Sequence, residues 1–178
     1  MARKTSLREF QHAVALRIRD AASRKTVLSR LGFQVGQDNW LVDLSDVSEV
    51  IPVPTIIAVP MTFSWYRGIA NIRGKLYSIA DFAAFQGQAP IGPGMERRVI
   101  LVAEKLIEGS GFVVNRMMGL HNPAQFTPEV VEAGVARPWI KGVYRDAEGK
   151  RWYELDLSGL TRNARFLEIG IVTAVAAA

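Results

Sequence analysis

The sequence predicts a mainly β fold that contains two groups of short strands. From residue 31 onward, short apolar runs alternate at close spacing with the turn-forming residues Gly, Pro, Asn and Asp, which is typical of all-β domains. A Gly- and Pro-rich stretch at 86–94 separates two groups of such runs, and the second group repeats the pattern of the first. About ten short strands in two groups predict either two small barrels or a sandwich, and periodicity alone does not choose between them.

The first 30 residues differ from the rest in charge and pattern. They hold eight Lys/Arg and two Asp/Glu, a net charge of +6, whereas the other 148 residues hold fourteen Lys/Arg and fifteen Asp/Glu. Ser6 and Glu9 match a capping box, and apolar residues at helical spacing then predict a helix over about 6–22. The stripe comprises Leu7, Phe10, Val14, Ile18 and Ala21. This basic leader is either a solvated helix face or a segment attracted to an acidic partner or membrane surface.

The first group of runs predicts five strands and one short helix. Arg73-Gly74 favours a hairpin or bend between the last two strands, and Asp81 is a suitable N-cap for a helix that ends at Phe85. The expected strands are 31–35, 40–44, 48–53, 68–72 and 75–80, with a tight turn at 36–39.

The second group predicts four strands and a closing helix. The run at 97–103 is almost wholly apolar, as expected for a strand that is buried on both faces. The expected strands are 97–103, 111–118, 140–144 and 151–157, with a short helix near 158–166. The predicted organisation is a basic helix and linker at 1–30, followed by one domain over 31–178. Its parts are a first lobe at about 31–86, a linker at 87–96, a second lobe at about 97–157, and a closing helix and tail at 158–178.

Composition and motifs argue against an enzyme and against a membrane-inserted protein. The chain has no cysteine, so disulfides, thiolate metal sites and cysteine nucleophiles are excluded. No signal peptide is expected, because charges recur throughout residues 1–30, and the uncharged stretch at 169–178 is too short for a bilayer helix. There is no G-x-S-x-G or H-E-x-x-H motif. The two histidines, His12 and His121, are expected to be structural, so no catalytic residue, metal or cofactor is predicted.

Two pairs of carboxylates have spacings that acid–base chemistry could use. Asp43 and Asp46 lie in a strand–turn context, where they are expected to cap a turn. Glu129 and Glu132 have i,i+3 spacing, but nothing beside them would separate their pKa values as acid–base catalysis requires. They are therefore interpreted as a solvated helix face.

The most informative segment lies between residues 44 and 82. Gly68 and Gly74 bracket a strand that carries Asn71 and Arg73. Strand alternation places Asn71 and Arg73 on one face with Ile69, and Ala70 with Ile72 on the other. Asp81 is the obvious partner in the chain for Arg73. This arrangement could present a docking surface, or Arg73 and Asp81 could simply hold one lobe together.

These residues resemble the CheW-like family, whose pattern is V-x-E-[IV], a proline-containing loop, G-[VI]-x-N-x-R-G, and then P-[VI]-x-D-[LF]. The matches to that pattern are Val47, Glu49, Val50, Gly68, Ile69, Asn71, Arg73, Gly74, Ile79, Asp81 and Phe82. Further similarity follows at 98–102, 111–120, 140–143 and 154–160, so the resemblance spans roughly 31–163. Ser78 stands where the family usually has proline, and Asn115 where it usually has aspartate. The helical N-terminal extension is similar to that of the branch that controls type IV pili, the PilI type.

The resemblance implies two five-stranded SH3-like β-barrels with a groove between them, joined by short helices and preceded by the N-terminal helix. It implies a non-catalytic cytoplasmic adaptor that couples the tip of a methyl-accepting chemoreceptor to the regulatory domain of a CheA-type histidine kinase. The implied kinase-contact residues are Val47, Glu49, Val50 and Gly68. The implied receptor-groove and first-lobe brace residues are Asn71, Arg73, Asp81, Val114 and Met117.

No nucleic acid and no membrane insertion are expected, although peripheral association with membrane receptor arrays is compatible with such an adaptor. Two other classes stay open at this point. One is a nucleic-acid-binding β-barrel that uses the basic leader, for which steep salt dependence is the expected sign. The other is an unrecognised enzyme in which Arg73 and Asp81 face a pocket.

Overall fold

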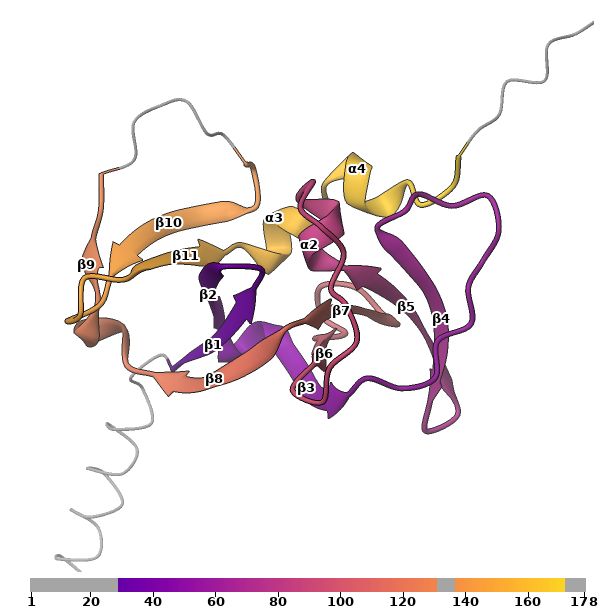
Figure 1. Cartoon of the computed structure of the whole chain (residues 1–178), viewed down its shortest axis with the longest axis horizontal. Helices are drawn as coiled ribbons and strands as arrows, with labels where there is room; N and C mark the ends of the chain where they lie inside the picture. The colour runs from indigo at the N-terminus through magenta and orange to yellow at the C-terminus, as the bar shows by residue number, and fades with distance from the viewer. Residues whose placement is uncertain (1–28, 131–136, 172–178) are drawn as a thin grey trace, which may run out of the picture.

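The computed structural model describes residues 29–130 and 137–171. The helix predicted over 6–22 lies outside these residues, as does Glu132. The described part is mainly β, as predicted, and its strands form two sheets that lie side by side in Figure 1. Among the described residues, no helix has both the length and the apolar character needed to cross a bilayer.

One sheet has six strands in the order β8-β1-β2-β11-β10-β9. Its strands are β1 (Arg30–Val35), β2 (Asp38–Asp43), β8 (Arg116–His121), β9 (Thr127–Pro128), β10 (Ile140–Arg145) and β11 (Arg151–Leu155). The predicted turn between the first two strands is confirmed, but it is tighter than expected. Val35 pairs with Asp38, so only Gly36 and Gln37 form the loop, and the positive φ of Gly36 (59°) suits this position.

The other sheet has five strands in the order β3-β6-β7-β5-β4. Its strands are β3 (Val47–Pro52), β4 (Tyr66–Ile72), β5 (Lys75–Asp81), β6 (Arg98–Val102) and β7 (Ser110–Val114). The apolar run that predicted a strand buried on both faces is β6, in which Val99 to Val102 are all buried. The two strands at the edges of this sheet are β3 and β4.

Short helices connect the strands. They are η1 (Leu44–Asp46), α2 (Phe82–Phe85), η2 (Pro123–Gln125), α3 (Leu157–Thr161) and α4 (Ala164–Leu167). Asp81 caps α2 as predicted, because its carboxylate accepts a hydrogen bond from the backbone N–H of Ala84. The single closing helix expected near 158–166 is two helices, and each has its own N-cap, Asp156 for α3 and Asn163 for α4.

Each sheet takes strands from both halves of the chain. β1 and β2 pair with β8 and β11, whereas β3 and β5 pair with β6 and β7. The expected lobes at 31–86 and 97–157 therefore do not separate the two sheets. The strand predicted over 111–118 is two strands that meet at Asn115, where the chain passes from the five-stranded to the six-stranded sheet. Asn115 accepts a hydrogen bond from the N–H of Gly36 (2.7 Å), which fixes this crossover against the β1–β2 turn.

A single large core lies between the sheets. Aromatic rings of the six-stranded sheet contact rings on α2 and β7: Phe33 lies 6.4 Å from Phe82 and 6.0 Å from Phe112, and Trp40 lies 5.2 Å from Phe82, between ring centroids. All four rings are fully buried. Because one cluster contains residues of both sheets, the sheets share this core. A second, smaller cluster of Leu41, Phe126 and Trp152 belongs to the six-stranded sheet.

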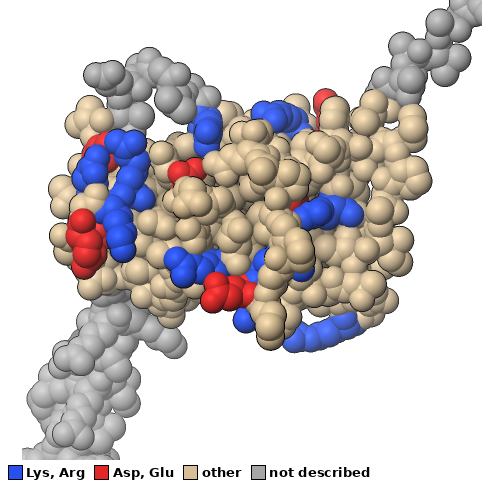
Figure 2. Space-filling view, viewed as in Figure 1, with Lys and Arg blue, Asp and Glu red and all other residues tan. Residues whose placement is uncertain are grey.

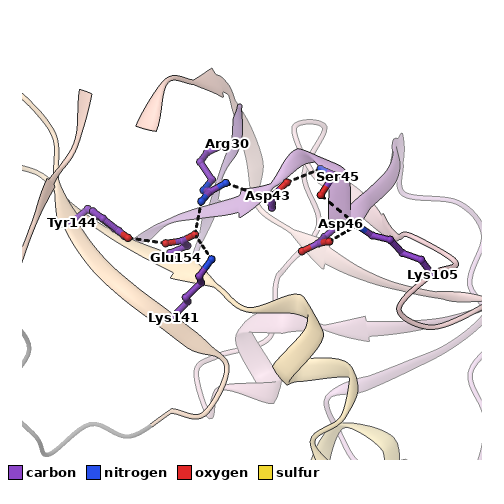
Figure 3. A network of polar contacts seen from close by, with 8 residues as sticks. All are labelled: Arg30, Asp43, Ser45, Asp46, Lys105, Lys141, Tyr144 and Glu154. Carbon is purple, nitrogen blue, oxygen red and sulfur yellow. Dashed lines mark hydrogen bonds and ion pairs between the residues drawn. The ribbon is translucent and has the colours of Figure 1, made fainter. Parts of the chain in front are cut away.

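A polar network lies where the chain first passes between the sheets (Figure 3). Arg30 of β1 forms ion pairs with Asp43 of β2 (2.7 Å) and with buried Glu154 of β11 (2.9 Å). Asp43 also accepts the N–H of Ser45, which confirms its predicted turn-capping role. Partial burial raises the pKa of Asp43, but its hydrogen bonds with Ser45 and the charges of Arg30 and Lys105 outweigh that effect, so its pKa lies below the ordinary value.

Candidate docking surface

The closest charged contact among the predicted site residues joins Arg73 to Glu49. The guanidinium donates two hydrogen bonds to the carboxylate, at 2.9 and 2.7 Å, in a bidentate arrangement. Glu49 lies on β3, and Arg73 lies in the turn between β4 and β5. Because β3 and β4 are the two edges of the five-stranded sheet, the pair shows that the sheet curls until its edges approach each other.

The Arg73–Gly74 turn places the arginine outside the strand ladder. Ile72 pairs with Lys75, so Arg73 and Gly74 form a two-residue loop, and both have positive φ, 53° and 85°. Two positive φ values are typical of a type I′ hairpin turn. Asn71 supports this loop, because its side-chain oxygen accepts the N–H of Gly74 at 2.8 Å. The predicted alternation in β4 is confirmed for Ala70, which is buried, and for Asn71, which is exposed.

Apolar side chains that the sequence did not single out lie on the same outer face. Ile57 forms an isolated bridge with Ile69, with hydrogen bonds of 2.8 and 2.9 Å, so their side chains project on the same side. Leu76 is the β5 partner of Asn71 and shares its face. Ile57 is 71% exposed and Leu76 is 66% exposed. No local signal marks Ile57 in the sequence, because a single bridge leaves no alternating pattern.

Ion pairs border these apolar residues. The pair of Arg73 and Glu49 lies at the hairpin turn, and Lys75 forms a second pair with Glu104 (2.8 Å). The hydrogen bond with Glu104 holds the pKa of Lys75 above its ordinary value, and the same bond lowers the pKa of Glu104. Exposed apolar side chains with a charged border are typical of protein-docking surfaces. We call Glu49, Arg73, Ile57, Ile69 and Leu76 the β3–β4 edge surface.

Gly68 was expected at the kinase-contact surface, but it is buried under the chain at Ile57. Its φ is 127°, and a Cβ at this position would lie 2.0 Å from the carbonyl oxygen of Ile57. Gly68 therefore allows the close approach of the Ile57 segment, and it presents no side chain to a partner.

The expected pairing of Arg73 with Asp81 is not formed. Asp81 is completely buried and pairs instead with Arg67 at 3.1 Å. It also accepts the N–H groups of Ala84 and Ile91, while Arg67 donates to the carbonyl of Ile91. Both backbone groups of Ile91 are thus held, which fastens the linker to β4 and β5. The expectation failed because Arg73 lies at the far end of β5 from Asp81.

The other predicted residues do not gather at one groove. Val114 is fully buried in the core, so its side chain does not line an open groove. Met117 is half-buried on β8 of the six-stranded sheet, opposite Phe33. Val47 and Val50 are half-buried on β3 and pack against the core. Of the nine predicted residues, the structure brings Glu49, Asn71 and Arg73 together at the β3–β4 edge.

Comparisons with known proteins agree with this fold. The family model described as CheW-like domain matches residues 30–165. Protein PilI of Pseudomonas aeruginosa is 29% identical over 147 residues, which cover 80% of each chain. A probable chemotaxis protein CheW of Rhizobium etli is 26% identical over 117 residues, covering 64% of this chain and 74% of that protein.

A solved structure has the same fold. The crystal structure of the scaffolding protein TtCheW from Thermoanaerobacter tengcongensis superposes with a TM-score of 0.63 at 20% identity, covering 73% of this chain and 89% of the other. Because the family model matches well over half of the chain, the chain belongs to the family of proteins with a CheW-like domain, and its similarity to PilI supports the PilI-type branch.

Proposed function

We propose that this protein is a non-catalytic adaptor that joins the cytoplasmic tip of a methyl-accepting chemoreceptor to the regulatory domain of a CheA-type histidine kinase. Its similarity to PilI favours a chemosensory pathway that controls type IV pili. The adaptor acts in the cytoplasm, beside the membrane receptors. We propose that the six-stranded and the five-stranded sheet are the counterparts of the two SH3-like lobes expected for the family, with the receptor groove between them.

The observation that carries this proposal is the β3–β4 edge surface. The side chain of Arg73 is 77% exposed and that of Glu49 is 35% exposed, and an ion pair this exposed contributes only about 0–1 kcal/mol to stability. The fold therefore depends little on the pair, whose charged groups are available to a partner beside the apolar side chains of Ile57 and Leu76. We propose this surface as the site for the kinase domain.

Replacing Glu49 tests the proposal. We expect Glu49→Lys to weaken binding of a CheA-type regulatory domain about tenfold or more, because it places a like charge beside Arg73 and removes the acceptor. Isothermal titration calorimetry with the full chain measures the affinity, and a urea titration confirms that the fold is kept. Unchanged affinity would remove this surface from the proposal.

A matched variant separates a specific effect from a general charge effect. Glu148 is exposed in the turn between β10 and β11, in the other sheet. Glu148→Lys makes the same change in net charge and should leave the affinity unchanged. An equal loss of affinity in both variants would indicate general electrostatic attraction.

The nucleic-acid alternative depends on the basic leader at residues 1–30. On the face shown in Figure 2, the Lys and Arg residues are spread over both sheets without forming one basic area.

A further inference from the structure

A cleft lined by arginines runs beside the linker between α2 and β6. The linker crosses the front of the molecule in Figure 1, and basic side chains flank it in Figure 2. On one side, a hollow of about 410 Å³ is lined by the β1–β2 turn, the linker, Asn115, Arg97 and Arg116. A second hollow of about 210 Å³ is lined by Arg67, Arg97 and three apolar residues, Val53, Ile56 and Val113. Arg97 lines both hollows, so they adjoin at its side chain, and we call the two hollows together the cleft.

One of the three arginines in this cleft has a carboxylate partner, and the other two bond only to neutral oxygens. Arg67 is paired with buried Asp81. Arg97 donates to the carbonyl oxygen of Gly94 at 3.1 Å, and Arg116 donates to the side-chain oxygen of Gln34 at 2.6 Å. Among the described residues, neither Arg97 nor Arg116 has a carboxylate partner, although the exposed Glu96 also lines the first hollow.

Several arginines of the described part have carboxylate partners, whereas Arg98, Arg137, Arg162 and Arg165 donate only to neutral oxygens, as Arg97 and Arg116 do. Arg97 and Arg116 differ from those four because both line the larger hollow. Arg145 and Arg151 both pair with Glu129, and Arg30 pairs with Asp43 and Glu154. A guanidinium that bonds only to a neutral oxygen keeps donors for a carboxylate, which it binds well in planar geometry. The apolar wall of the second hollow, formed by Val53, Ile56 and Val113, favours a ligand that carries apolar groups beside its charge.

From these contacts we propose that the cleft binds an acidic segment of a partner protein. Carboxylates of that segment bind Arg97 and Arg116, and its apolar side chains fill the hollow above Val53 and Ile56. The linker residues Gly92 to Met95 are exposed at the rim, where they leave the cleft accessible. The inference rests on the proposed function only in that the partner is a protein, and the two arginines on which it depends, Arg97 and Arg116, are not part of the β3–β4 edge surface.

The test uses a short fluorescein-labelled peptide rich in Glu and Leu, with fluorescence anisotropy as the readout and the full chain as the protein. We expect the peptide to bind, and the variant Arg97→Gln/Arg116→Gln to bind it about fivefold more weakly or worse, since two charge-assisted contacts are lost. Binding should weaken as salt rises from about 0.05 to about 0.3 M. The same peptide with Gln in place of every Glu should bind more weakly than the Glu peptide.

A control is needed because residues 1–30 carry a net charge of +6 and can attract any anion. Arg162 is exposed, lies after α3, and donates to the carbonyl of Ser158 much as Arg97 does to Gly94. Arg162→Gln should therefore leave peptide binding unchanged. The inference is overturned if the peptide does not bind, if the cleft and control variants bind it equally, or if the Gln peptide binds as well. It is also overturned if the Arg97→Gln/Arg116→Gln variant loses more affinity for a labelled oligothymidylate than for the peptide. None of these outcomes depends on a kinase, so they are distinguishable from failure of the Glu49 test.

Discussion

At the residue scale, the structure separates side chains that hold the fold from side chains that are free to bind. Asp81 is fully buried, and its oxygens accept from Ala84 and Ile91 while it pairs with Arg67. A buried carboxylate with these contacts is a structural group, because removing it would leave its donors unsatisfied. Arg73, by contrast, is mostly exposed and bonds to a half-exposed partner. Both residues match the family pattern, so the pattern itself does not distinguish the two roles.

Gly68 is one of the residues that hold the fold, and two glycine variants can test this role. Gly68→Ala should lower the free energy of unfolding by about 2–4 kcal/mol, because the new Cβ would meet the Ile57 carbonyl at 2.0 Å and the φ of 127° is strained for alanine. Gly74→Ala has open space around the new Cβ, so only its positive φ matters and the cost should be about 1 kcal/mol. Urea unfolding followed by tryptophan fluorescence measures both. Equal costs would show that the contact with Ile57 is not decisive.

At the element scale, the sequence could predict strands and turns better than their partners. The alternation of Ala70 and Asn71 and the turn at Arg73-Gly74 follow from local residue types, and the structure confirms them. The change of sheet at Asn115 has no local signal, because an apolar run continues on both sides of it. The partner of Arg73 was likewise not predictable. Alternation gives the face of a strand, whereas the approach of β3 to the β4–β5 turn depends on the curvature of the whole sheet.

The short edge strand β9 gives a prediction about pH. Glu129 follows β9 and forms ion pairs with Arg145 on β10 and Arg151 on β11, so it fastens β9 to its neighbours. The hydrogen bond from Arg151 is the main cause that holds the pKa of Glu129 below its ordinary value, and the nearby charges of Arg145 and Arg151 add to it against partial desolvation. A carboxylate with a lowered pKa in the folded state stabilises the fold above its unfolded pKa of about 4.3, and this contribution is lost as the pH falls through the folded pKa.

The stability difference between wild type and Glu129→Gln should therefore shrink as the pH falls from about 7 to about 3. Urea titrations across this range measure the difference. Glu148→Gln provides the control, because Glu148 is exposed and has no ion pair among the described residues. The difference in stability between wild type and Glu148→Gln should be smaller and should change less with pH. A Glu129→Gln difference that stays constant or grows on acidification would contradict the assigned role of the ion pairs.

At the scale of the whole molecule, the strand pairing links the two halves of the chain. β1 pairs with β8, β2 with β11, β3 with β6, and β5 with β7, and each of these pairs joins a strand before the linker to a strand after it. The shared core, with Phe33 and Trp40 against Phe82 and Phe112, connects the sheets as well. A perturbation at the β3–β4 edge therefore has a packed route to the other sheet, which the proposed adaptor function would use.

This pairing predicts what happens when the chain is cut in the linker. Fragment 1–88 would keep only the β1–β2 and β4–β5 hairpins, and fragment 89–178 only the pairs β6–β7, β10–β11 and β9–β10. Two-stranded hairpins are at best marginally stable in water, and β9 adds only two residues to the β10–β11 hairpin. Neither fragment alone should therefore show a cooperative urea transition by circular dichroism. Mixing the two fragments should restore the spectrum and a cooperative transition, because the strand pairs that join one side of the linker to the other can then form. Two lobes that folded independently on either side of the linker would give the opposite result, a cooperative transition in each separate fragment, and that outcome would contradict the strand order of both sheets.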